Sequence, residues 1–177
     1  MILEYKLKEQ DFLEFQLFTA SKSERINKKK RKGWIMLTLS SIVVACFFFL
    51  NENMTMTIYF GVVAIATVLF YPTYFKWRYK KHYKGYIREN YSKRFGELQT
   101  LEINEHSLIS KDKISEGKIN LKEIGQIDET ANHFFLKIST GMTLLIPKEE
   151  ISGLDRLRGQ FKELGFTIND EVNWKWK

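Results

Sequence analysis

The chain has 177 residues, one cysteine and a formal net charge of +7 that is unevenly distributed. Residues 1–33 carry a net +4 and residues 76–97 a net +6, so the positive charge flanks an apolar segment at 34–75, while residues 98–177 carry a net −2. This distribution argues against a nucleic-acid partner, because the C-terminal region would repel phosphate, and one cysteine excludes both an intramolecular disulfide and a thiolate metal cluster.

The N-terminal region, residues 1–33, predicts a strand followed by a helix. Ile2–Leu7 alternates apolar and polar residues, which is typical of a half-buried strand. A single strand needs a partner, so we expect it to pair with the strand-rich region at 98–177. Asp11 with Glu14 resembles a capping box and predicts a helix from Asp11. That helix is expected to continue into a basic block that ends before Gly33 and comprises Lys28, Lys29, Lys30, Arg31 and Lys32.

The apolar segment at 34–75 predicts two transmembrane helices joined by a tight turn. The first run, 34–50, has no charged residue, and its 16 residues after Trp34 give about 24 Å of helix. The second run, 54–75, is long enough to span a bilayer. Asn51–Asn53 forms the polar turn between them. Neither run contains Asp, Glu, His, Lys or Arg, which is typical of an anchor rather than a transporter.

Aromatic and basic residues at the ends of both runs predict contact with lipid headgroups. Aromatic side chains suited to the bilayer interface are Trp34, Tyr71, Tyr74 and Trp77. In addition to the basic block, the expected membrane-surface cations are Lys76, Arg78, Lys80 and Lys81. We expect residues 76–97 to form a basic and aromatic juxtamembrane helix that ends at Gly96.

The distribution of Lys and Arg predicts the orientation. Nine lie before the first run, eight lie in 76–97, and none lies in the connecting turn. By the positive-inside rule, a two-pass protein of the cell membrane with both termini in the cytosol is expected. Val43–Cys46 also matches a lipoprotein cleavage pattern, but 33 residues precede the apolar run, and apolar residues continue beyond Cys46. We therefore interpret Cys46 as an apolar helix residue.

The C-terminal region, 98–177, predicts a small antiparallel β domain of short strands that is closed by one helix. Turn residues separate the expected strands, which are 98–104, 106–111, 113–120, 125–129, 133–139 and 142–147. Apolar residues at helical spacing from Ile151 to Leu164 predict an amphipathic helix that stops at Gly165, with Glu149 and Glu150 favouring its N-terminus. The residues after Phe166 are expected to add a last strand or a tail.

The pattern of residues in this region is similar to that of a known protein family. The resemblance is carried by Ser115, Gly117, Ile119, Leu121, Ile124, Ile127, 134–138, 145–147 and the closing helix. In these residues, and in the order of strand, helix, apolar hairpin and β domain, the chain resembles the YcxB-like family of bacterial membrane proteins. The resemblance implies a cytosolic domain similar to a pleckstrin-homology barrel, in an α+β membrane protein. It implies no catalytic residues.

The residues needed for catalysis are sparse. His82, His106 and His133 have no partner at metal-ligand spacing, and the two later histidines are expected to be solvated or structural. Ser115 and Lys118 match Ser-x-x-Lys, but that chemistry needs a helix start and this segment predicts a strand. We expect no enzyme activity, no metal and no cofactor.

These observations favour a membrane-anchored, non-enzymatic interaction module that binds a cytosolic or membrane protein at an exposed sheet edge or in the groove beside the closing helix. The alternative is a sensor of anionic lipid headgroups, in which the basic residues do more than set topology. A membrane hydrolase is a third hypothesis. Gly61 with Ala64 offers a small-residue contact within the hairpin or in a homodimer.

Overall fold

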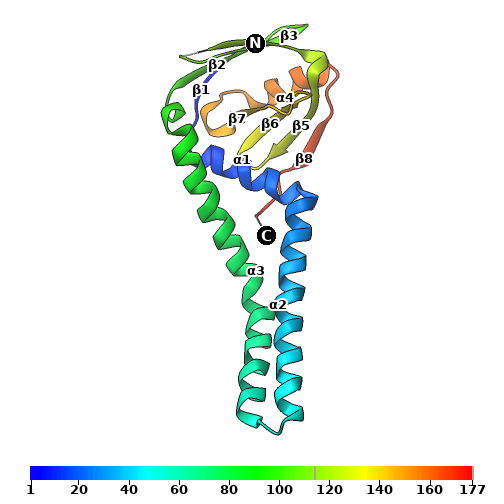
Figure 1. The fold of residues 1–177 in the computed structure, drawn as a ribbon. Helices are drawn as coiled ribbons and strands as arrows, with labels where there is room; N and C mark the ends of the chain where they lie inside the picture. The colour runs from blue at the N-terminus through cyan, green and yellow to red at the C-terminus, as the bar shows by residue number, and fades with distance from the viewer. Residues whose placement is uncertain (114, 177) are drawn as a thin grey trace. The chain divides into compact units, whose positions relative to one another are not determined.

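The computed structural model describes residues 1–113 and 115–176 and has an α+β fold of two compact units (Figure 1). The first, called here the β unit, contains residues 1–16 and 84–175. The second, called the hairpin unit, contains residues 17–83 and Trp176. The N-terminal residues 1–16 therefore belong to the same unit as residues 84–175, and Trp176 belongs to the same unit as residues 17–83.

The hairpin unit is built on two long helices that run side by side (Figure 1). They are α2 (Glu24–Leu50) and α3 (Met54–Tyr91), and the predicted turn at 51–53 joins them. Both helices are long and apolar enough to cross a membrane. Most of the exposed large hydrophobic side chains of the described residues belong to these two helices, and none of the residues of α2 is buried.

The ends of these helices differ from the prediction. The preceding helix, α1 (Glu9–Lys22), stops before the basic block, and the Ser23 side chain accepts a hydrogen bond from Ile26 N–H as the N-cap of α2. The basic block is therefore part of the same helix as the first apolar run. The predicted juxtamembrane helix is likewise a continuation of α3, which ends at Tyr91 and is followed by the 3-10 turn η1 (Ser92–Arg94) rather than ending at Gly96.

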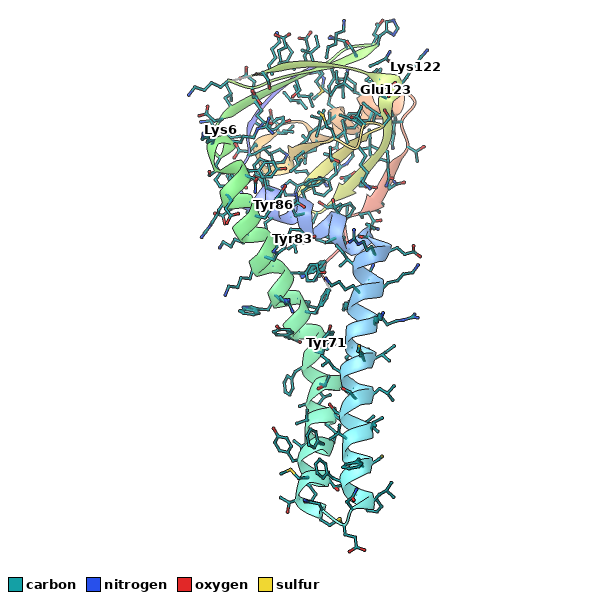
Figure 2. The ribbon with its side chains drawn as sticks, viewed as in Figure 1. Lys6, Tyr71, Tyr83, Tyr86, Lys122 and Glu123 are labelled. Atoms are coloured by element: carbon teal, nitrogen blue, oxygen red, sulfur yellow. The ribbon has the colours of Figure 1, made fainter. Side chains whose placement is uncertain are left out.

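The helices α2 and α3 approach each other closely at Gly33 and Tyr71. A Cβ placed on Gly33 would clash with the Tyr71 hydroxyl, and Tyr71 projects from α3 in Figure 2. Farther along, Phe48 stacks on Phe60 with ring centroids 5.8 Å apart. Ala64 is buried, as expected of a small-residue contact within the hairpin. A Cβ on Gly61 would meet open space, so Gly61 makes no close contact with α2, and its part in a homodimer stays a prediction.

The first sheet of the β unit confirms the prediction that the N-terminal strand pairs with the C-terminal region. Strand β1 (Ile2–Lys6) lies antiparallel to β2 (Leu98–Ile103), with Leu3 opposite Leu101. The sheet has the order β1-β2-β3-β4, in which the last two strands are β3 (Ser107–Lys111) and β4 (Glu116–Asn120).

The second sheet has the order β7-β6-β5-β8. Its strands are β5 (Ile124–Thr130), β6 (His133–Ile138), β7 (Thr143–Pro147) and β8 (Ile168–Glu171). The predicted strands from 98 to 147 are confirmed to within three residues at each end. The strand pairs are antiparallel as predicted except at β8, which is the last strand expected after Phe166 and pairs parallel to β5 after the chain returns through α4.

Helix α4 (Leu154–Glu163) buries Leu157 and Phe161, and the Phe161 ring centroid lies 6.0 Å from that of Phe134 in β6. Its predicted start at Ile151 was wrong, because Gly153 takes a left-handed conformation with φ of 85° immediately before the helix. The role predicted for Glu149 and Glu150 was also wrong. They lie in the 3-10 turn η3 (Lys148–Glu150), where Glu149 and Glu150 pair with Lys8 at 3.1 and 3.2 Å.

Candidate functional site

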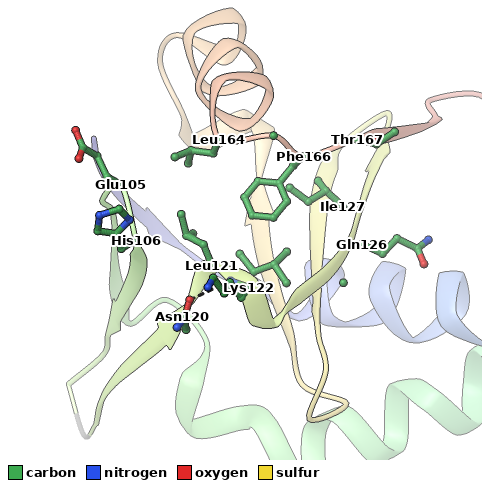
Figure 3. Close-up of a pocket in the computed structure, with 13 residues that line it drawn as sticks. Glu105, His106, Asn120, Leu121, Lys122, Gln126, Ile127, Leu164, Phe166 and Thr167 are labelled. Atoms are coloured by element: carbon green, nitrogen blue, oxygen red, sulfur yellow. Dashed lines mark hydrogen bonds between the residues drawn. The ribbon is translucent and has the colours of Figure 1, made fainter.

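A groove lies beside the C-terminal end of α4, the closing helix, which was one of the two docking places expected (Figure 3). Its volume is about 710 Å³, within the usual range of ligand sites. We call it the α4 groove. Its apolar surface comes from Leu121, Ile124, Ile127, Leu164 and Phe166, and its polar rim from Glu105, His106, Asn120, Lys122, Gln126 and Thr167. An apolar floor with a mixed polar rim suits a peptide or a small organic ligand.

Local hydrogen bonds shape the floor of this groove. The Asn120 side chain accepts a hydrogen bond from Lys122 N–H at 3.1 Å and caps the 3-10 turn η2 (Leu121–Glu123), which connects the two sheets (Figure 3). Leu121 N–H donates to the His106 carbonyl at 3.1 Å. This turn places Leu121 in the groove between the two sheets.

The opposite wall is set by the turn after α4. Gly165 adopts a φ of 85°, so the helix ends there as predicted, and Phe166 N–H donates back to the Phe161 carbonyl at 2.9 Å. The Phe166 ring then lies edge-on to Phe161, with centroids 6.5 Å apart. The half-buried Phe166 thus extends the apolar core into the groove.

Two sheet edges meet the α4 groove. Among the strands that the structure describes, β4 pairs only with β3 and β8 only with β5, so each has one open edge. Asn120 at the end of β4 and Thr167 just before β8 both line the groove. An extended segment lying here could add to a sheet edge while placing an apolar side chain against Phe166.

A buried polar network, missed from the sequence, holds α1 against β6. The side chain of His133 is 3% exposed, with Nε2 2.8 Å from Asp11 Oδ1 and Nδ1 3.2 Å from Glu14 Oε1. Asn132 donates to the other Glu14 oxygen at 3.0 Å. His133 also stacks on Phe135 with centroids 5.5 Å apart.

In this network each charged group shifts the pKa of its partner so that both stay ionised. Burial disfavours the charged form of His133, but the hydrogen bond to Asp11 and the nearby carboxylate of Glu14 outweigh it and raise the His133 pKa to about 8. Burial likewise opposes ionisation of Glu14, yet the nearby His133 imidazole and the hydrogen bond from Asn132 lower its pKa. We therefore interpret His133 as a structural cation, in agreement with the structural role that was one of the two expected.

The sequence feature that belongs to this network is the pair Asp11 and Glu14, which the sequence pattern suggested to be a helix cap. Asp11 does cap, but from inside the helix: Lys8 N–H donates to its carboxylate at 2.6 Å, and α1 begins at Glu9 instead of Asp11. The spacing of three that suggested a capping box also puts Asp11 and Glu14 on one side of α1. Only the fold brings that side to His133, 119 residues after Glu14.

A second buried charge connects β5 to α4. Glu129 lies 2.6 Å from both the Lys148 ammonium and the Arg158 guanidinium. Burial raises the Glu129 pKa, but the hydrogen bonds from Arg158 and Lys148 dominate and lower it. In the described part of the chain, no group of three or more His, Cys, Asp or Glu side chains could hold a metal ion.

The predicted membrane-surface cations all lie on α2 and α3 of the hairpin unit. Seven of them are exposed, and Lys30 and Lys76 are half-buried. The Lys30 ammonium lies 5.8 Å from the Phe75 ring centroid, and that of Lys81 lies 5.2 Å from the Trp77 ring. The ammonium groups of these two lysines thus lie over aromatic rings, in the arrangement of a cation–π contact.

The predicted interfacial aromatic residues fall into two pairs. Tyr74 and Trp77 are exposed, at 49% and 59%, with ring centroids 6.2 Å apart. By contrast, Tyr71 contacts Gly33, and the indole N–H of Trp34 is buried without a hydrogen-bond partner among the described residues. Contact with headgroups remains a prediction for all four, with the first pair better placed to make it.

The family match to known proteins lies entirely within the β unit. The β unit is a domain of two four-stranded sheets with a helix packed on the second. Residues 103–158, from the end of β2 into α4, match the model of the family described as YcxB-like protein, which confirms the resemblance over this part. No curated protein and no solved structure matches the chain.

Proposed function

We propose that the protein is a non-enzymatic interaction module of the cell membrane, anchored by the hairpin unit, that binds an extended segment of a protein partner in the α4 groove. The observation that carries the proposal is the meeting of an apolar floor with two open sheet edges in one groove. Main-chain hydrogen bonds to an edge supply affinity and the pocket supplies side-chain selection, which is a common mode of peptide recognition.

The membrane anchor is supported by the surface of the hairpin unit. Large apolar side chains on α2 and α3 face outward, including Phe47 at 60% and Leu50 at 80% exposed. Such a continuous exposed apolar surface is unfavourable in water and suits hydrocarbon. The Lys and Arg residues beyond both runs, with none at 51–53, support a cytosolic β unit. A reporter fused to the C-terminus should be active only in the cytosol.

The β unit is also proposed to be pleckstrin-homology-like. In support, β1–β4 form one sheet, β5–β7 belong to the next, and a helix follows β7. The added parallel strand β8 provides one of the two edges at the α4 groove.

Photocrosslinking in native membranes tests the docking site. A benzoyl-phenylalanine at Gln126, on the groove rim, should capture one protein partner, and Thr167→Arg should abolish that capture by placing a charge against the groove. The matched control is Thr100→Arg, because Thr100 pairs with Glu4 and Lys111 on the outer face of the first sheet. Equal capture by the two arginine variants would refute the docking site.

Sensing of anionic lipid is the second candidate, favoured by the exposure of seven predicted surface cations. Each basic residue near an anionic surface contributes about 1 kcal/mol. Neutralising the basic block separates this function from a role in topology. Lost lipid preference with intact topology would support sensing, whereas altered topology would leave the block as an orientation signal.

A further inference from the structure

A second cavity of the β unit, of about 780 Å³, lies between its two sheets next to α1. It arises from the inner face of the first sheet, where one row of paired residues runs Leu3, Leu101, Ser110 and Gly117 from β1 to β4. Leu3 and Leu101 are buried in the core, but the side chains shrink toward β4. A Cβ on Gly117 would meet nothing within 4 Å, so the cavity opens directly beneath this residue.

One part of the cavity is apolar. Phe15 reaches it from α1, Ile119 from β4, and Ile138 and Leu144 from the β6–β7 hairpin. Met142, at the tip of that hairpin, also lines it and is 58% exposed. These side chains give the cavity an apolar surface that a hydrocarbon chain can cover.

Another part of the cavity is polar and offers hydrogen-bond donors. Asp112 is already well supplied, because it accepts from the backbone N–H and the hydroxyl of Ser115 at 2.7 and 3.0 Å, and from Arg94 at 3.2 Å. Among the described residues Asp112 is the only acidic partner of Arg94, whose side chain is 49% exposed. The guanidinium has five N–H donors, so most remain available to an incoming acceptor.

We propose that this cavity binds a long-chain fatty acid, with the carboxylate on Arg94 and the acyl chain along Gly117 toward Ile119 and Leu144. The charge and polarity of the lining select this ligand: a guanidinium with spare donors forms two parallel hydrogen bonds to a carboxylate, and the apolar part takes a hydrocarbon chain. This site is separate from the α4 groove and does not depend on the proposed function of that groove.

Photolabelling of the full-length protein in maltoside micelles tests the proposal. The probe is a palmitic acid that carries a diazirine near its methyl end, and adducts are mapped by peptide mass spectrometry. Adducts on α2 and α3 are expected from any apolar probe and serve as the internal reference. Adducts within 115–120 or 142–145 report the cavity.

Filling the cavity should block it. Gly117→Leu places a side chain in the open space and should lower the ratio of cavity adducts to reference adducts by about tenfold. Glu116→Leu, on the outer face of the same strand, should leave the ratio unchanged. Adducts confined to α2 and α3, or undiminished cavity labelling in Gly117→Leu, would overturn the proposal.

Binding of the carboxylate head group is tested with the unmutated protein. This test therefore stays valid even if the Gly117→Leu variant misfolds. The methyl ester of the same probe should label the cavity about tenfold less than the acid, because it lacks the charge that Arg94 binds. Arg94→Gln should reduce labelling by the acid to the level of the ester. Arg88→Gln, which removes an exposed guanidinium paired with Glu9, should not. Equal labelling by acid and ester in the native protein would refute the fatty-acid assignment.

Discussion

The two units of this protein place the same kinds of side chain in opposite environments. In the β unit, Phe134 and Phe135 are completely buried, whereas in the hairpin unit Phe47 and Phe49 are about 60% exposed. The β unit therefore has an apolar core of the kind that water drives together. The hairpin unit has an apolar exterior, so its stability and its solubility depend on an apolar surrounding. Composition alone does not distinguish these cases; the location of the apolar residues does.

The largest expected effect tests the core of the β unit. Phe134→Ala removes a fully buried ring that packs against Phe161 and should lower the free energy of unfolding by about 3–5 kcal/mol. Phe47→Ala in the hairpin unit should change it little. Protection of the β unit from protease, measured in detergent against urea concentration, gives both values. Equal losses would contradict the contrast between the units.

A charge introduced into the hairpin unit tests whether its exposed apolar surface faces lipid. Val43 is 59% exposed and lies midway along the first apolar run, so Val43→Lys should make membrane insertion less favourable by about 2.5–3.5 kcal/mol. The fraction of protein recovered in membranes measures this change. Val43→Leu serves as the control. Undiminished recovery of the lysine variant would show that α2 does not face lipid at this position.

The pH dependence of the β unit should reflect His133. Because folding raises the His133 pKa from 6.5 to about 8, its contribution is complete below pH 6.5 and is lost as the pH rises through 8. The loss amounts to about 2 kcal/mol. Protease protection at pH 6 and pH 9 should show this difference in the native protein, and His133→Gln should abolish it. A stability that rises between these pH values would refute a structural imidazolium.

The smallest effect is expected on the outer face of the β unit. Lys111 pairs with Glu116 at 3.2 Å, but their side chains are 48% and 60% exposed. Lys111→Ala should therefore change the free energy of unfolding by less than about 0.5 kcal/mol. A loss comparable to that of Phe134→Ala, in the same protease assay, would mean that this surface ion pair contributes as much as a buried core ring.

Periodicity was sufficient to predict most of the fold. The alternation at Ile2–Leu7 required a partner strand, and only the C-terminal region could provide it. The start of α4 was misplaced because apolar spacing continues to Ile151, whereas the backbone conformation at Gly153 decides where the helix begins. Helix boundaries in general depend on such local geometry, which periodicity does not report.

The sites were less predictable than the fold. The α4 groove lies beside the closing helix, which was one of the two docking places expected, but the meeting of two sheet edges at this groove was not expected. The contact of His133 with Asp11 and Glu14 depends on the packing of α1 on β6, and no local pattern encodes it. Gly117 was noticed only as part of a family resemblance, and its importance to the second cavity follows from its register opposite Ser110.

The pairing of β1 with β2 has a consequence for biosynthesis. About 90 residues separate these strands, including both long helices, so the first strand made must remain unpaired until the second leaves the ribosome. At ordinary rates of translation this interval is roughly 5–20 s. A chain interrupted after the helices would carry two complete apolar segments and an orphan strand. Until β2 is made, β1 therefore keeps unpaired backbone groups along its edge, which other strands can pair with.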